Sequence, residues 1–192
     1  DTQKALNCLH EAFFEANIKE LNLFVIGVGN VGSKLMEQIH QQQQYLQEML
    51  QLRIRVIAMA NSRTMLVSQD GIDLSTWQDQ LAKGEASNVD AFFAHAKTLN
   101  LRNSIFVDNT ANEAIAKEYQ RYLESNIGVV TCNKIACADQ FTNYQTLKKT
   151  SRKYSSPFLF ETNVGAGLPI IDTLSNLIAS CDRIHKIQAV LS

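Results

Sequence analysis

Three glycines spaced as G-x-G-x-x-G, at Gly27, Gly29 and Gly32, are the residues whose spacing most directly indicates chemistry. Such a loop turns tightly, lets a pyrophosphate approach the backbone where no Cβ intervenes, and allows the next helix to lie close on a sheet. Unpaired N–H groups and the positive dipole end of that helix then bind phosphate. The motif therefore predicts a dinucleotide site that also includes Asn30 and Val31.

The residues on either side supply the strand and the helix that this motif needs. Residues 23–26 read Leu-Phe-Val-Ile, an apolar run typical of a buried strand, and Val31, Leu35 and Ile39 recur at helical spacing. Glycines also punctuate ordinary loops, so a plain strand-to-helix turn is the alternative. The context on both sides favours the dinucleotide interpretation.

The end of the next expected strand, residues 54–60, indicates which dinucleotide is bound. In folds selective for NAD an acidic residue here accepts hydrogen bonds from the ribose 2′-hydroxyl, whereas arginine attracts the 2′-phosphate of NADP. This sequence has Asn61, Ser62 and Arg63 at that place and no carboxylate. We expect NADP to be preferred, with Arg63 as the phosphate partner and NAD left open. A solvated loop arginine is the alternative.

Further polar residues follow two more expected strands. Asn109 and Thr110 come after residues 104–108, and Lys134 comes after residues 127–131. Open α/β sheets bind ligands at the carboxyl ends of their strands. We therefore expect Asn109 and Thr110 to bind the cofactor, and Lys134 to donate hydrogen bonds to the cofactor or to a substrate oxygen. Capping of the next helix, and a plain surface lysine, are the alternatives.

The second informative stretch is residues 158–171, where we expect a strand ending at Glu161, a glycine loop, and a helix opened by Pro169. Small residues in this loop expose backbone carbonyls. Carbonyl oxygens together with the Glu161 carboxylate would suit a hard cation. A turn that leads into the helix, with Glu161 as a structural acceptor, is the alternative.

The remaining periodicity predicts an α/β protein with a Rossmann-type, doubly wound, mostly parallel sheet. Trp77 is interpreted as a core anchor. A half-exposed antiparallel strand is expected at residues 184–191. Helices are expected at residues 5–14, 31–49, 74–81, 90–99, 113–123 and 139–149.

Composition excludes several classes of protein. The 192 residues are 45% hydrophobic and 19% charged, with a formal net charge of −1. This balance is typical of a globular protein and gives no electrostatic reason to expect nucleic acid or a membrane as a partner. No apolar run approaches the roughly 20 residues that span a bilayer, and no signal-peptide pattern opens the sequence. Reduced, mostly buried cysteines and a cytoplasmic location are therefore expected for Cys8, Cys132, Cys137 and Cys181.

Four stretches taken together resemble homoserine dehydrogenase. They are residues 27–32, 60–63, 131–134 and 161–169, of which Asn-Val-Gly-Ala-Gly-Leu-Pro after an Asn-Lys is the specific one. The match runs from about residue 21 onward. The segment before it looks like the linker that follows the kinase in bifunctional aspartokinase–homoserine dehydrogenases.

The resemblance implies a small-molecule reaction, the reversible reduction of L-aspartate 4-semialdehyde to L-homoserine by NAD(P)H on the route to threonine and methionine. It implies that Lys134 is catalytic, with its ammonium stabilising the developing alkoxide. It also implies a sodium ion bound by Glu161 and by the carbonyls of Val164, Ala166 and Leu168.

The resemblance further implies a domain division. Residues 1–20 would be a linker helix, residues 21–168 the NAD(P)-binding domain, and residues 169–192 the start of a truncated α+β substrate and dimerisation domain. We expect the chain to bind cofactor with little turnover alone, and its parent to be a homo-oligomer fused to an aspartokinase. The alternatives are an NADP-binding module of another small-aldehyde or amino-acid oxidoreductase, and a non-catalytic nucleotide sensor.

Overall fold

Seven strands form one sheet in the computed structural model, which describes residues 2, 6 and 18–190. The predicted helix over residues 5–14 lies outside the described residues, apart from Leu6. The strands are β1 (Lys19–Ile26), β2 (Leu52–Ala60), β3 (Thr64–Val67), β4 (Glu85–Ala86), β5 (Ser104–Asp108), β6 (Gly128–Thr131) and β7 (Phe158–Leu159). The helices are α2 (Asn30–Leu50), α3 (Trp77–Ala82), α4 (Val89–Leu99), α5 (Glu113–Ala116), α6 (Tyr119–Glu124), α7 (Ile135–Ala138), α8 (Phe141–Tyr154) and α9 (Ile171–Ala179), with the 3-10 turn η1 (Glu161–Asn163).

The order of the strands confirms the doubly wound prediction. The sheet runs β4-β3-β2-β1-β5-β6-β7, and β1, β2, β5, β6 and β7 are parallel. From β1 the chain builds outward to β2 on one side and later returns to place β5 on the other. Strand order therefore reverses between β1 and β5, and a crevice outside the carboxyl ends of the strands at such a switch point is where ligands bind.

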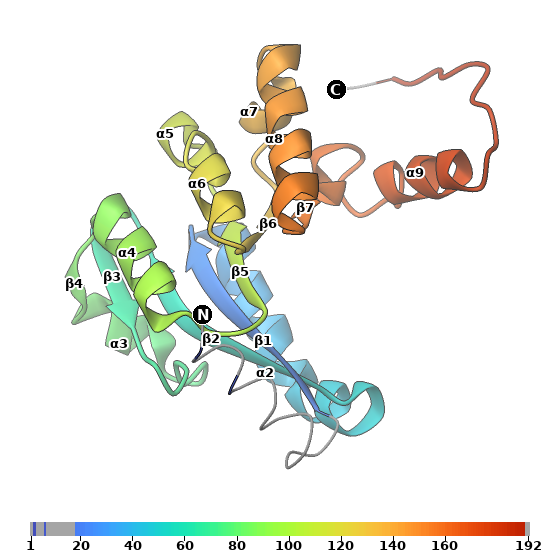
Figure 1. Ribbon diagram of the computed structural model, residues 1–192. Coiled ribbons are helices and arrows are strands. Elements are labelled where there is room, and N and C mark those ends of the chain that lie inside the picture. The colour runs from blue at the N-terminus through green and yellow to red at the C-terminus, as the bar shows by residue number, and fades with distance from the viewer. Residues whose placement is uncertain (1, 3–5, 7–17, 191–192) are drawn as a thin grey trace.

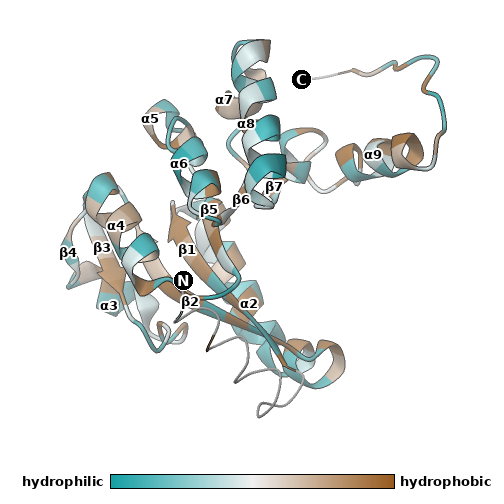
Figure 2. Ribbon diagram, in the orientation of Figure 1, coloured by the Kyte–Doolittle hydropathy of each residue, from teal (hydrophilic) through white to brown (hydrophobic). Residues whose placement is uncertain are grey.

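Alternate residues of the strands pack on opposite faces of the sheet. Phe24 and Ile26 belong to a core cluster with residues of α4, α6 and α8, whereas Leu23 and Val25 belong to a second cluster with residues of α2 and α3. Figure 1 shows α2 behind the sheet and α4 in front of it. In Figure 2 β1, at the centre of the sheet, is largely brown, and much of α2 is teal. Helices thus cover both faces, as parallel strands that are apolar on both sides require.

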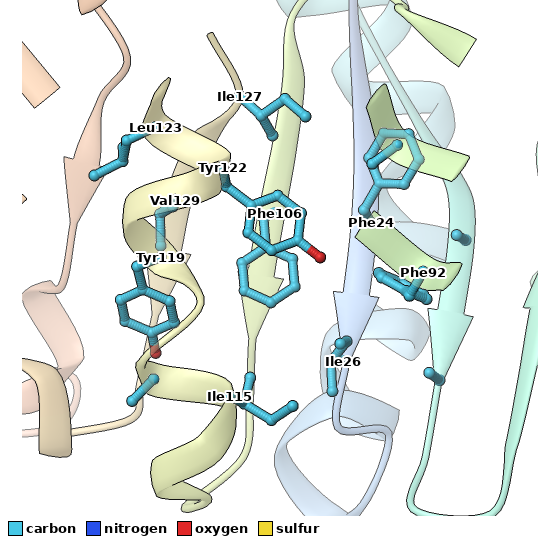
Figure 3. Packing of buried hydrophobic residues seen from close by; sticks show 14 of the residues in the cluster. Phe24, Ile26, Phe92, Phe106, Ile115, Tyr119, Tyr122, Leu123, Ile127 and Val129 are labelled. Carbon is cyan, nitrogen blue, oxygen red and sulfur yellow. The ribbon is translucent and has the colours of Figure 1, made fainter. Parts of the chain in front are cut away.

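Aromatic side chains of α6 pack on β5 and β7. The ring of Tyr122 stacks on Phe106, with centroids 4.0 Å apart and planes 9° from parallel, as Figure 3 shows. The ring of Tyr119, one turn earlier in α6, packs against the rings of Phe106 and Phe158, with centroid distances of 6.1 and 6.0 Å. Trp77 is only 7% exposed, which confirms its interpretation as a core anchor.

Three differences from the predicted elements arise in short or interrupted segments. Strands β3 and β4 pair antiparallel at the edge of the sheet and were not predicted. With four and two residues, they are too short to show a periodicity in the sequence. The helix expected over residues 113–123 is divided by a turn at residues 117–118 into α5 and α6. The strand expected to end at Glu161 stops at Leu159, and Glu161 begins η1.

The prediction of a strand at residues 184–191 was wrong over the part that the structure describes. Residues 182–190 form neither helix nor strand and are exposed. Alternating hydropathy produces a strand only when a neighbour supplies the ladder of hydrogen bonds, and no described strand pairs with this segment. Figure 1 shows α9 and this segment standing apart from the sheet, beyond α8.

The expectation of mostly buried cysteines was also wrong among the described residues. Cys132 and Cys137 are half-buried and Cys181 is exposed, and all three are free thiols. Cys181 follows α9, a helix in which no residue is buried.

Candidate functional site

The carboxyl ends of four strands lie at one level of the sheet. Ile26 of β1 pairs with Ala60 of β2 and with Asp108 of β5, and Asp108 pairs with Thr131 of β6. Backbone hydrogen bonds continue this register by one residue, from Gly27 N to Ala60 O at 2.9 Å, Asn109 N to Ile26 O at 2.9 Å and Cys132 N to Asp108 O at 3.1 Å. The loops that carry the predicted site residues therefore start side by side.

Each glycine of the loop has a different structural role. Gly27 has a φ of +92°, and a Cβ on it would lie 2.8 Å from Thr110 Cγ2. A Cβ on Gly32 would lie 2.0 Å from the carbonyl oxygen of Gly27, so α2 can approach β1 only with glycine there. Around Gly29 there is nothing within 4 Å of a Cβ position, so this corner is open. The first and third glycines shape the turn and the second leaves room for a ligand.

The start of α2 offers donors without acceptors. Gly29 is the N-cap, no side chain caps the helix, and its first turn contains no acidic residue. Within the described residues the backbone N–H groups of Asn30, Val31 and Gly32 have no acceptor. Asn109 Nδ2 is buried beside Gly32 and is also without a partner among the described residues. The free N–H groups at a helix start bind anions, and a buried donor such as Asn109 Nδ2 normally finds an acceptor, so this set fits an anion such as a pyrophosphate.

A cavity of about 580 Å³ continues from this corner towards the end of β2. Val28, Gly29, Arg63 and Trp77 are among its lining residues. Asn61 Oδ1 accepts the N–H groups of Arg63 at 2.7 Å and Thr64 at 2.8 Å, which reverses the chain into β3. Arg63 is exposed, and in the described structure its guanidinium has no ion pair or hydrogen bond. It is thus a free cation at the rim of the cavity.

Comparison with known proteins agrees with this geometry. Residues 27–161 match the model of the homoserine dehydrogenase NAD-binding domain. The chain belongs to the homoserine dehydrogenase family. It is 37% identical to a bifunctional aspartokinase/homoserine dehydrogenase of Haemophilus influenzae, over 98% of this chain and 23% of that protein. It is 34% identical to a homoserine dehydrogenase of Schizosaccharomyces pombe, over 92% of this chain and 48% of that protein.

A solved structure shares the fold. A hyperthermophilic archaeal homoserine dehydrogenase in complex with NADPH superposes with a TM-score of 0.66 at 24% identity, covering 84% of this chain and 50% of that one. The chain thus spans no more than about half of these relatives, and it corresponds to the cofactor domain of the homoserine dehydrogenase family. None of the described helices is long and apolar enough to cross a membrane.

The site residues that were predicted to follow β5 and β6, Thr110 and Lys134, lie in adjacent loops. Thr110 is half-buried, with its backbone N–H on Asp108 Oδ1 at 2.7 Å and its methyl group beside Gly27. Lys134 is the N-cap residue of α7, and its exposed ammonium has no ion pair or hydrogen bond with any described residue. Asn112 caps α5 by accepting the N–H of Ala114 at 2.8 Å, so helix capping, the alternative for this loop, applies to Asn112.

Asp108, the last residue of β5, faces the interior of the protein. It sits at the ligand edge but is fully buried, and its carboxylate is satisfied from within. Oδ2 accepts the hydroxyl of Tyr119 at 2.6 Å and Nδ2 of Asn133 at 3.0 Å. The Tyr119 hydroxyl also lies 2.7 Å from Thr131 Oγ1. No periodic pattern in the sequence indicates these contacts, since the partners are 11 to 25 residues apart.

The thiol beside this network lies in surroundings that disfavour its thiolate form. Cys132 Sγ lies 3.9 Å from Asn109 Oδ1. Burial, followed by the nearby charge of Asp108, raises the pKa of the Cys132 thiol above its ordinary value. A thiol that keeps its proton does not act as a nucleophile.

Glu161 has the structural role that the alternative interpretation described. Its two carboxylate oxygens accept the N–H groups of Ile171 at 3.0 Å and Asp172 at 2.8 Å, at the start of α9. Pro169 precedes that helix by two residues. The glycine loop is therefore closed by a carboxylate on a helix N-terminus, a favourable placement for a negative charge.

Stability at alkaline pH reports on the two buried phenols. Burial raises the pKa of Tyr119 and of Tyr122 above 10, and for Tyr119 the charge of Asp108 adds to the shift. The folded state keeps both protons while the unfolded chain releases them above about pH 10. The free energy of unfolding should therefore fall, by about 1.4 kcal/mol per pH unit for each phenol. Urea denaturation between about pH 9 and about pH 12 measures this. If the free energy of unfolding of Tyr119→Phe fell with pH as steeply as that of the wild type, the prediction would be contradicted.

Proposed function

We propose that the chain is the NADP-binding domain of an enzyme that reduces L-aspartate 4-semialdehyde to L-homoserine. The observation that carries this is the set of unpaired donors at the start of α2, open at Gly29 and continuous with the cavity rimmed by Arg63. The N–H groups of Asn30, Val31 and Gly32 would hold the pyrophosphate. The family match and the identity with homoserine dehydrogenases support the same assignment.

Each remaining site residue has a role in this proposal. Arg63 pairs with the 2′-phosphate, which selects NADP over NAD, while Asn61 and Ser62 form the turn that presents it. Asn109 and Thr110 contact the cofactor from the β5 loop. When bound, the reduced nicotinamide supplies the hydride for the aldehyde carbon. Lys134 donates a hydrogen bond to the carbonyl oxygen, stabilises the negative charge that develops on it and protonates it.

A sodium ion in the glycine loop belongs to the same proposal. The Val164 and Ala166 carbonyls accept no hydrogen bond from any described residue, while the Leu168 carbonyl accepts one from Ile170 N at 2.9 Å. The Glu161 oxygens each accept a single N–H, which leaves lone pairs for a cation. The oxygen atoms of these four residues have the hard chemistry that sodium requires.

The domain division is also proposed rather than observed. Residues 21–168 form the cofactor domain, after a linker at residues 1–20. Residues 169–192 begin the substrate and dimerisation domain of a homo-oligomeric parent fused to an aspartokinase, as in the bifunctional relatives. The lack of any buried residue in α9 supports this division, because an amphipathic helix of this kind gains stability from a packing partner.

Calorimetric titration of the 192-residue chain with NADPH and NADH tests the cofactor assignment. Arg63→Ala should weaken NADPH binding by about 10- to 100-fold and leave NADH binding unchanged, since only NADPH carries the 2′-phosphate. Arg152→Ala is the matched control, an exposed arginine at the C-terminal end of α8, just before β7 begins. Equal affinity of the wild-type chain for both cofactors would remove the NADP preference, and no binding of either would remove the proposal.

A further inference from the structure

The Asp108 network connects three loops at the ligand edge. Asn133 donates from Nδ2 to Asp108 Oδ2 at 3.0 Å and to the carbonyl of Asn112 at 3.1 Å, and its Oδ1 accepts the N–H of Ile135 at 3.1 Å. The carbonyl of Asn133 accepts from Asn163 Nδ2 at 3.3 Å, which reaches η1. The β5 loop, the β6 loop and the 3-10 turn are thereby held to one buried carboxylate.

The network borders the residues that are proposed to act at the nicotinamide end. Asp108 Oδ1 holds the backbone of Thr110, and Asn133 directly precedes Lys134. Arg63, at the end of β2, marks the adenosine half, and in a doubly wound fold the second mononucleotide half lies across the switch point, over β5 and β6. The network thus lies under one half of the site and away from the other.

We propose that Tyr119, Asp108 and Asn133 are positioning residues that set Thr110 and Lys134 for the nicotinamide half of the cofactor, an inference that rests on the proposed function. The Tyr119 hydroxyl donates to Oδ2 of Asp108, and the side chain is fully buried between Phe106 and Phe158. Removing that hydroxyl leaves a buried carboxylate with one donor fewer. A fixed site loses precision when the residues behind it are no longer held.

The neighbouring tyrosine provides a matched control. Tyr122 lies in the same helix, is equally buried and stacks on the same Phe106 ring. Its hydroxyl, however, has no hydrogen-bond partner among the described residues. In Figure 3 the hydroxyl groups of Tyr119 and Tyr122 point in different directions. Tyr119→Phe and Tyr122→Phe therefore remove the same atom from the same core, and only the first change breaks the network.

The experiment compares two ligands by calorimetry on the full 192-residue chain. NADPH contains both halves of the cofactor, whereas 2′-phospho-ADP-ribose lacks the nicotinamide. Tyr119→Phe should weaken NADPH binding by about tenfold and change binding of 2′-phospho-ADP-ribose by less than about twofold. Tyr122→Phe should leave both affinities unchanged. A purely structural role would alter the two affinities in the same proportion.

Other outcomes overturn the inference in separable ways. Suppose that the wild-type chain binds both ligands. If Tyr119→Phe then weakens binding of both ligands equally, or weakens binding of neither ligand, the positioning role is wrong and the proposed function stands. If wild type binds neither ligand, the proposed function fails and the inference fails with it. If Tyr119→Phe does not fold, Thr131→Val replaces it, because this change removes the hydroxyl that accepts the N–H of Asn133 at 2.8 Å while keeping the side-chain volume.

Discussion

Gly29→Asp should abolish NADPH binding and at the same time stabilise the fold. The Cβ position of Gly29 meets nothing within 4 Å, and its backbone is extended at φ −73°. Aspartate is a good N-cap residue and its charge suits the helix dipole, so the free energy of unfolding should rise by about 0.5 to 1 kcal/mol. The same carboxylate would occupy the place of the pyrophosphate and repel it, weakening NADPH binding by about 1000-fold or more.

Opposite signs for stability and binding separate function from folding at this residue. Thermal denaturation and calorimetric titration of the same preparation measure the two effects. Gln69→Asp is the charge-matched control, because Gln69 is exposed in the turn that follows the antiparallel strand β3 and so lies away from the carboxyl edge. NADPH bound by Gly29→Asp with wild-type affinity would show that the phosphates do not sit at this corner.

Gly32→Ala should destabilise the fold more than any other single methyl group added to the glycine loop. Its Cβ would lie 2.0 Å from the Gly27 carbonyl oxygen and 2.9 Å from the Gly27 carbonyl carbon. Both are backbone atoms, so the start of α2 has to move away from β1. We expect a loss of about 2 to 4 kcal/mol in the free energy of unfolding.

Gly29→Ala is the matched control for this change. It adds the same methyl group three residues earlier, where there is space. Urea denaturation of the two variants should therefore differ by most of the predicted loss, with similar m-values if both unfold in one cooperative step. Equal stabilities would mean that α2 does not lie against the carbonyl of Gly27.

Features that depend on local sequence were predicted correctly. The apolar run before Gly27 and the helical spacing after it defined β1 and α2, and the same reasoning located β2, β5 and β6. Parallel strands place their following loops at one edge, so the loops that carry Arg63, Thr110 and Lys134 were expected at the same edge of the sheet.

The parts that the sequence could not predict depend on tertiary contacts. Asp108 directly precedes the predicted ligand residues Asn109 and Thr110, yet it faces inward because Tyr119 and Asn133 supply its donors from other elements. The reversal into β3 comes from the Asn61 side chain, which accepts two backbone N–H groups. Apolar and polar residues alternate after residue 184, but no described strand pairs with this segment. Alternating hydropathy without a pairing strand does not produce a strand.

The most direct test of the central claim is a two-dimensional ¹H–¹⁵N NMR titration of the labelled chain with NADPH. We predict saturable shifts of the backbone amides of Val31, Gly32 and Thr110, and of the residues around Arg63, with little change at the C-terminal end of α8. Shifts confined to the groove between α5 and α8, lined by Lys117, Asp139 and Leu147 among others, with the Val31 and Gly32 amides unmoved, would contradict phosphate binding at the start of α2.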